Sequence, residues 1–152
     1  AVRHIVDDKL YVYVDGSLDG NVTDTTGDIS SSDTIEIGRR STGEYFIGQI
    51  AQSSVYSKAL SVSEISAIYS LGRHANLLDS YSDNLVGYWA MSALDDNTGL
   101  KDVGNGTIYD RSGQSNHGTA TNTEAADLAS SPNAEPNGYA KGDTIRDSSS
   151  KA

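Results

Sequence analysis

The sequence predicts an all-β fold with one short helix. Hydrophobic residues make up 36% of the 152 residues, below the usual share of a globular domain, and 15 glycines accompany abundant Ser, Thr, Asp and Asn. Short segments alternate between apolar and polar positions, which is the period of a strand with one buried face. A single segment has the start and spacing of a helix. A chain of this length has room for one hydrophobic core rather than two full domains.

The first strand lies at Lys9 to Val14 (KLYVYV), where aliphatic residues alternate with tyrosines. Asp15 and Gly16 follow, a dipeptide that adopts positive φ cheaply and closes a tight hairpin. Residues 21–33 are mostly Thr, Asp, Gly and Ser, so we expect a loop there. Thr34 to Ile37 (TIEI) alternates again and predicts a second strand.

A longer strand and the helix come next. Tyr45 to Tyr56 predicts a strand, in which Gly48 indicates a bulge or a close backbone approach. Ser61 and Glu64 have the spacing of a capping box, with apolar residues at helical intervals behind them. Gly72 is a natural end for this helix.

The second half begins with a polar connector at residues 73–84. Leu85 to Met91 (LVGYWAM) is the most apolar strand candidate and holds the only Trp. Thr107 to Tyr109 and His117 to Thr121 predict two short partner strands, joined by a turn at residues 110–116.

Residues 123–152 contain few large apolar side chains. Such a segment cannot build its own core, because it buries too little surface to offset the entropy of ordering it. We expect it to be mostly without regular secondary structure and to be ordered by contact with other chains.

The expected core consists of the apolar members of the alternating strands. These residues are Leu10, Val12, Val14, Ile35, Ile37, Phe46, Ile50, Val55, Tyr56 and Trp89. Replacing a buried Phe46 by Ala is then expected to cost about 3–5 kcal/mol.

Composition excludes several functions. The formal net charge of −10 repels phosphate backbones and anionic lipids, so we expect neither nucleic acid nor membrane as a partner. No apolar stretch approaches the ~18 residues of a membrane span. Without cysteine, neither a disulfide nor a thiolate metal site can form.

Several motifs in the first half occur together and in order. They are residues 10–16 (LYVYVDG), 37–41 (IGRRS) and 46–65, which run from Phe46 through Val55-Tyr56 and Ala59-Leu60-Ser61 to Glu64-Ile65. This pattern resembles the second half of a concanavalin-A-like, laminin-G-like lectin jelly roll. The resemblance implies a jelly-roll sandwich, partial or permuted, with one short helix.

Residues 85–89 (LVGYW) and 109–119 (YDRSGQSNHGT) resemble the start of the same family. The family's last half therefore comes first in this chain, and its middle strands are missing. The chain divides into a jelly-roll half at 1–72, a connector at 73–84, a second partial module at 85–122 and a tail at 123–152. Tandem modules, circular permutation and strand exchange each explain this order, and we favour tandem modules.

This succession of motifs resembles tail-fibre and structural proteins of bacteriophages. The resemblance implies a non-catalytic structural or adhesion component of a virion or cell-surface assembly, in contact with other protein subunits and with glycans. The alternative is a free-standing carbohydrate-binding lectin. Both place the protein on a virion or an extracellular surface.

An enzyme is not expected. Glucanases of this fold carry Glu-x-Asp-x-x-Glu, since retaining hydrolysis needs two carboxyl groups roughly 5–5.5 Å apart. None of the glutamates has that spacing; they are Glu36, Glu44, Glu64, Glu124 and Glu135.

Two groups of residues are candidates for ligand binding. Sugars stack on aromatic rings and bind planar polar groups, which points to Tyr13, Arg39, Arg40 and Tyr45.

For calcium, the oxygen-rich turns contain Asp110 with Asn116, and Asp95 with Asn97 and Asp102. The family's second acidic ligand is replaced here at Ala51-Gln52, so no cofactor is expected. The alternative role for Asp110 is a turn residue that binds its own backbone.

Overall fold

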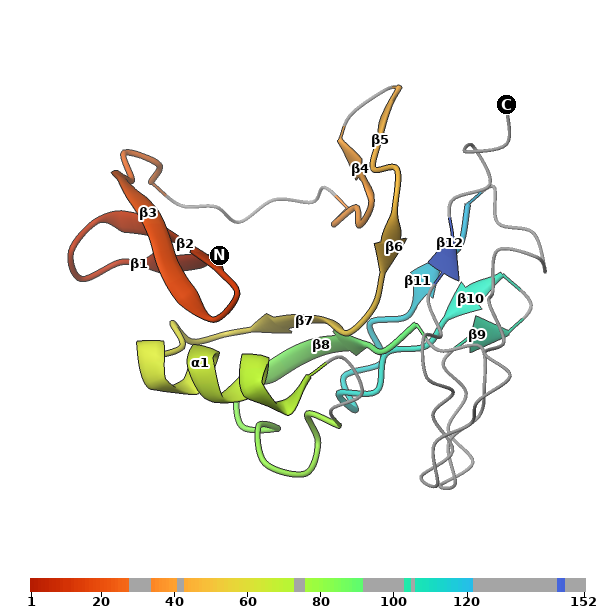
Figure 1. The fold of residues 1–152 in the computed structure, drawn as a ribbon. Helices are drawn as coiled ribbons and strands as arrows, with labels where there is room; N and C mark the ends of the chain where they lie inside the picture. The colour runs from red at the N-terminus through yellow and green to blue at the C-terminus, as the bar shows by residue number, and fades with distance from the viewer. Residues whose placement is uncertain are drawn as a thin grey trace.

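The computed structural model describes residues 1–27, 34–40, 43–72, 76–91, 103–104, 106–121 and 145–146. Within these residues the chain forms antiparallel sheets and one helix, so the predicted all-β fold class is confirmed (Figure 1). The strands are β1 (Val2–His4), β2 (Lys9–Val14), β3 (Ser17–Thr23), β4 (Arg39–Arg40), β5 (Glu44–Tyr45), β6 (Gln49–Ile50), β7 (Ser53–Tyr56), β8 (Leu85–Trp89), β9 (Val103–Gly104), β10 (Thr107–Ile108), β11 (Gly118–Thr119) and β12 (Ile145–Arg146).

The N-terminal sheet has the strand order β1-β2-β3 and lies at one end of the molecule (Figure 1). The predicted hairpin is confirmed: Val14 pairs with Ser17 across a two-residue turn. Asp15 and Gly16 have φ values of 50° and 75°, as a turn that matches the strand twist requires. A Cβ on Gly16 would lie 2.9 Å from the Tyr69 ring, so the helix packs closely on this turn.

Helix α1 (Val62–Leu71) begins and ends where the sequence predicts. The Ser61 hydroxyl accepts the backbone N–H of Glu64 at 3.2 Å, and the Glu64 carboxylate accepts the backbone N–H of Ser61 at 2.7 Å. Gly72 caps the other end with φ 75°, and its N–H donates to the Tyr69 carbonyl. The capping box and the glycine together fix both ends of the helix.

The centre of the molecule is the antiparallel pair β7–β8, which joins the two halves of the sequence. On one side of β8 the buried residues are Leu77, Leu85, Tyr88 and Ala90, with Tyr56, Ile68, Leu78 and Tyr81 packed against them. On the other side they are Trp89, Met91 and Ile108, with Ile50 and Ala120 packed against them. The hydrophobic core therefore surrounds β8.

Strands β9, β10 and β11 form a second sheet, in the order β11-β10-β9, as predicted for the pair around the turn at 110–116. The hairpin of β4 and β5 stands apart from it (Figure 1). At Ile145–Arg146 the tail forms strand β12, which pairs with β6 of the same chain, so at these two residues the expected ordering by another chain is wrong. The rest of the tail, 123–144 and 147–152, lies outside the described residues, so its predicted ordering by another chain stays a prediction.

Most of the predicted core is wrong. Trp89 is buried, and Leu10, Ile50 and Tyr56 are partly buried. The exposed members are Val12, Val14, Ile35, Ile37, Phe46 and Val55. Alternation identifies the apolar face of a strand, but that face is buried only where a second layer covers it. In the described part of the chain, no second sheet packs on β1–β3.

Three predicted strand boundaries also change. Thr34 to Ile37 is not a strand; pairing begins at Arg39, after Gly38 turns the chain at φ 82°. The predicted strand from Tyr45 to Tyr56 divides into β5, β6 and β7, and Gln52 with φ 56° separates the last two. β3 continues to Thr23, into the predicted loop, because it pairs with β2 as far as Lys9.

Candidate functional site

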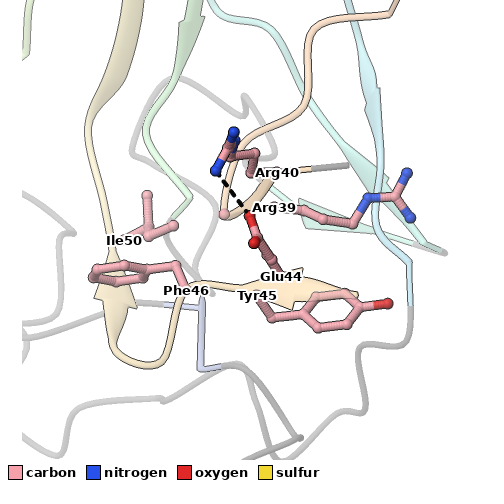
Figure 2. A pocket seen from close by; sticks show the side chains of 7 residues that line it. Arg39, Arg40, Glu44, Tyr45, Phe46 and Ile50 are labelled. Atoms are coloured by element: carbon pink, nitrogen blue, oxygen red, sulfur yellow. Dashed lines mark hydrogen bonds and ion pairs between the residues drawn. The ribbon is translucent and has the colours of Figure 1, made fainter. Parts of the chain in front are cut away.

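A shallow pocket of about 440 Å³ opens at the β4–β5 hairpin (Figure 2). Its lining residues are Gly38, Arg39, Arg40, Glu44, Tyr45, Phe46 and Ile50. Its volume falls within the range of small-molecule sites. Three of the four predicted ligand-binding residues thus meet here: Arg39, Arg40 and Tyr45.

The hairpin register decides which side chains share a face. Arg39 lies opposite Tyr45, and Arg40 lies opposite Glu44. Directly opposed residues of an antiparallel pair point to the same face. In Figure 2, Arg39 and Tyr45 extend in one direction, whereas Arg40 and Glu44 face each other in the middle of the pocket.

Both guanidinium groups have carboxylate partners. Arg40 Nη1 lies 3.2 Å from Glu44 Oε2, and Arg39 pairs with Glu36. The Arg39–Glu36 hydrogen bond lowers the pKa of Glu36 and raises the pKa of Arg39, to which the Tyr45 hydroxyl adds. These pairs are exposed to solvent, so they add little to stability.

Two glycines contact Phe46, one of the aromatic residues of the pocket. The Phe46 N–H donates to the Gly38 carbonyl at 2.8 Å, which closes the hairpin. A Cβ on Gly48 would lie 2.6 Å from Phe46 Cε1, so the ring rests directly on the Gly48 backbone. Of the two alternatives that the sequence predicts at Gly48, a bulge or a close backbone approach, this contact favours the close approach, made here by a side chain. Tyr45 and Phe46 remain 50% and 53% exposed.

One residue predicted to bind ligand lies away from the pocket, and some residues that line the pocket were not predicted to bind ligand. Tyr13 lies on β2, opposite Leu18, and does not line the pocket. Glu44 was not singled out as a ligand, and Phe46 and Ile50 were assigned to the core. The adjacent apolar residues Phe46 and Ile47 are the signal that at least one of them lies outside the core, because successive residues of a strand point to opposite faces.

The second predicted group, Asp110 and Asn116, lies in the turn beside β8. The Asp110 carboxylate accepts four hydrogen bonds: from the backbone N–H groups of Tyr88 (2.8 Å), Ser112 (2.8 Å) and Asn116 (2.9 Å), and from the Ser112 hydroxyl (2.8 Å). Burial is the largest single influence on the pKa of Asp110 and raises it, but these hydrogen bonds together outweigh burial and leave the pKa below its usual value.

Asn116 fastens the same turn to β8. Its side-chain amide donates to the Val86 carbonyl at 2.8 Å, and its own carbonyl accepts Trp89 Nε1–H at 2.9 Å. A carboxylate offers about four lone-pair sites, and Asp110 uses all four on donors. These contacts favour the turn role of Asp110 over the calcium role. In the part of the chain that the structure describes, no three His, Cys, Asp or Glu side chains gather where they could hold a metal ion. The other cluster, Asp95 with Asn97 and Asp102, lies outside the described residues.

No helix among the described residues has the length and apolar character needed to cross a membrane.

Residues 1–66 match a laminin-G-type family model, described as the concanavalin A-like lectin/glucanases superfamily. The matched region covers less than half of the chain and contains β1 to β7 and the whole pocket. It confirms the resemblance inferred from the motifs between residues 10 and 65. No curated protein and no solved structure matches the chain. The match over residues 1–66 and the antiparallel sheets are together consistent with a concanavalin-A-like all-β fold, and a domain of the matched type suggests a carbohydrate-binding or structural role.

Proposed function

We propose that this chain is a non-catalytic structural or adhesion component of a larger assembly, on a virion or a cell surface, and that it contacts other protein subunits. The observation that carries the proposal is the apolar face of the β1–β3 sheet. Val12, Val14 and Val22 are 47%, 53% and 59% exposed. Leu10 pairs with Val22, and Leu10, Val12 and Val14 alternate along β2, so they form one face.

A contiguous apolar face has a different meaning from single exposed residues. Scattered apolar side chains are normal on protein surfaces, but clustered ones mark sites of protein contact. The ordinary sandwich of this fold buries such a face beneath a second sheet. A neighbouring subunit that supplies strands of alternating apolar residues would complete the sandwich.

The carboxylates support a role without catalysis. Glycoside hydrolysis needs two carboxyl groups that flank the scissile bond. In the described part of the chain, Glu36 and Glu44 are paired with arginines, and Asp110 is occupied by four donors.

Size-exclusion chromatography with light scattering tests the proposal on the full chain. We expect association that increases with concentration, and we expect the double variant Val12→Lys/Val14→Lys to abolish it. Val62→Lys serves as the matched control, since Val62 is an exposed valine on α1. A monomer at every concentration, with a cooperative thermal transition, would contradict the proposal and favour the free-standing lectin.

A second function, carbohydrate binding, is favoured by the pocket itself. Arg39, Arg40 and Tyr45, whose chemistry suits contact with sugars, line the same shallow pocket within the matched region. Carbohydrate binding is compatible with assembly, because the pocket and the β1–β3 face involve different strands.

A further inference from the structure

We propose that the β4–β5 pocket selects an uncharged pyranose, with Phe46 as the stacking surface and the Arg40–Glu44 pair as the partner of adjacent sugar hydroxyls. The inference rests on the proposed carbohydrate contact and adds to it a ligand class and a principal residue.

The charges of the site favour an uncharged ligand. Arg40 is paired with Glu44 and Arg39 with Glu36, so the four side chains carry no net charge. The chain as a whole has a formal net charge of −10. An acidic sugar would compete with both carboxylates for the guanidinium groups and would approach through a repulsive field. A neutral sugar neither competes with the carboxylates nor is repelled by the negative charge of the chain.

Phe46 has the properties of a stacking surface. One part of its ring rests on the Gly48 backbone, where an added Cβ would lie only 2.6 Å from Cε1, yet the residue is 53% exposed. The hydrogen bond from its N–H to Gly38 fixes the backbone beneath it. The ring is therefore held in place before a ligand arrives, which lowers the entropy lost on binding. A pyranose carries an apolar C–H face that suits such a ring.

The Arg40–Glu44 pair supplies the polar contacts. A hydroxyl both donates and accepts, a guanidinium only donates, and a carboxylate only accepts. Two adjacent sugar hydroxyls can therefore bind Arg40 and Glu44 together, since the two charged groups lie 3.2 Å apart. Figure 2 shows this pair next to Phe46 and Ile50, so a sugar stacked on Phe46 has its rim near the charged groups.

Saturation-transfer NMR on the full chain tests the inference, with lactose, maltotriose and cellotriose as neutral probes and 3′-sialyllactose as the acidic probe. We expect at least one neutral probe to bind, with the strongest transfer to its ring C–H protons and no change in affinity when NaCl is raised. We expect Phe46→Ala and Glu44→Gln each to weaken binding about tenfold. Gly48→Ala should weaken it several-fold, because the new Cβ displaces the ring without removing it.

Ile47→Ala is the matched control, because Ile47 is 74% exposed, neighbours Phe46 and does not line the pocket. Circular dichroism of every variant separates lost binding from lost folding. Three results overturn the inference: no binding by any neutral probe, salt-sensitive binding of 3′-sialyllactose alone, or equal binding by Phe46→Ala and the parent chain. Light scattering of the same samples reports assembly separately, so failure of the sugar site is distinguished from failure of the assembly proposal.

Discussion

The backbone N–H of Tyr88 donates a 2.8 Å hydrogen bond to the carboxylate of Asp110. The N–H of Arg111 returns a 2.8 Å bond to the Tyr88 carbonyl. β8 is therefore paired with β7 on one edge and held by the turn at 110–116 on the other. On this edge of β8, the Asp110 carboxylate and the Arg111 N–H bind the backbone groups of Tyr88 that a neighbouring strand would otherwise bind.

Asp110→Asn should lower the free energy of unfolding by about 2–3 kcal/mol, because an amide nitrogen would face N–H donors and the charge that strengthens these bonds is lost. Urea denaturation measures the change. Asp19→Asn is the control, since Asp19 is an exposed residue of β3 and should change stability little. Equal effects of the two substitutions would mean that Asp110 does not hold the turn.

Glu64 should make the stability of α1 sensitive to acid. The hydrogen bond from Lys58, then those from the backbone and hydroxyl of Ser61, lower the pKa of Glu64 from 4.5 to about 2. Since the folded state binds this proton more weakly than the unfolded state, the stabilisation is present above pH 4.5 and is lost as the pH falls towards about 2. NMR titration of the Glu64 carboxyl measures the pKa directly. We expect Lys58→Gln to move it back towards 4.5; no movement would refute the assignment of Lys58 as the main cause.

Replacing a core residue and replacing a pocket residue should change stability by very different amounts. Leu85→Ala should cost about 3 kcal/mol, because Leu85 is buried beside Tyr88 and Leu77. Phe46→Ala should cost less than about 1 kcal/mol, since half of that side chain is already in water. Denaturation of both variants under the same conditions decides this, and a larger loss for Phe46→Ala would restore the core assignment made from the sequence.

Calcium should not stabilise the described turn. Asp110 is occupied by four donors, and the Gln52 side chain, where the family's second acid would stand, accepts the Tyr88 hydroxyl. We expect the thermal midpoint to be the same in EDTA and in added CaCl₂. A rise in the midpoint with calcium that Asp110→Asn removes would show that the turn binds the ion.

Local features were predictable from the sequence, but whether a second layer of structure covers a given strand was not. The turn at Asp15-Gly16 and the cap at Ser61 depend on neighbouring residues, so the sequence alone identifies them. The burial of Leu77 depends on β8, which follows it in the chain, and it was assigned to a polar connector. Val12 has the pattern of a core residue, but a pattern in one strand does not reveal whether another layer lies above it.

For the pocket, residue chemistry identified Arg39, Arg40 and Tyr45, because sugars stack on aromatic rings and bind planar polar groups. The role of Phe46 depends on the break between β5 and β6, which places its ring on Gly48. An unbroken strand from Tyr45 to Tyr56, as the sequence pattern suggests, would have no such pocket.

The pairing of β7 with β8 limits how far the chain can fold during its synthesis. A growing chain makes the first hairpin, the pocket and α1 well before it makes Leu85. Until then Tyr56 and Ile68 have no β8 to pack against, and the edge of β7 that β8 later occupies is open. Closing this connection is a non-local step that carries a loop-closure cost. The emergence of residues 85–91 from the ribosome therefore sets the earliest moment at which Tyr56 and Ile68 can complete their packing, and any contact made before then is with a partly folded chain.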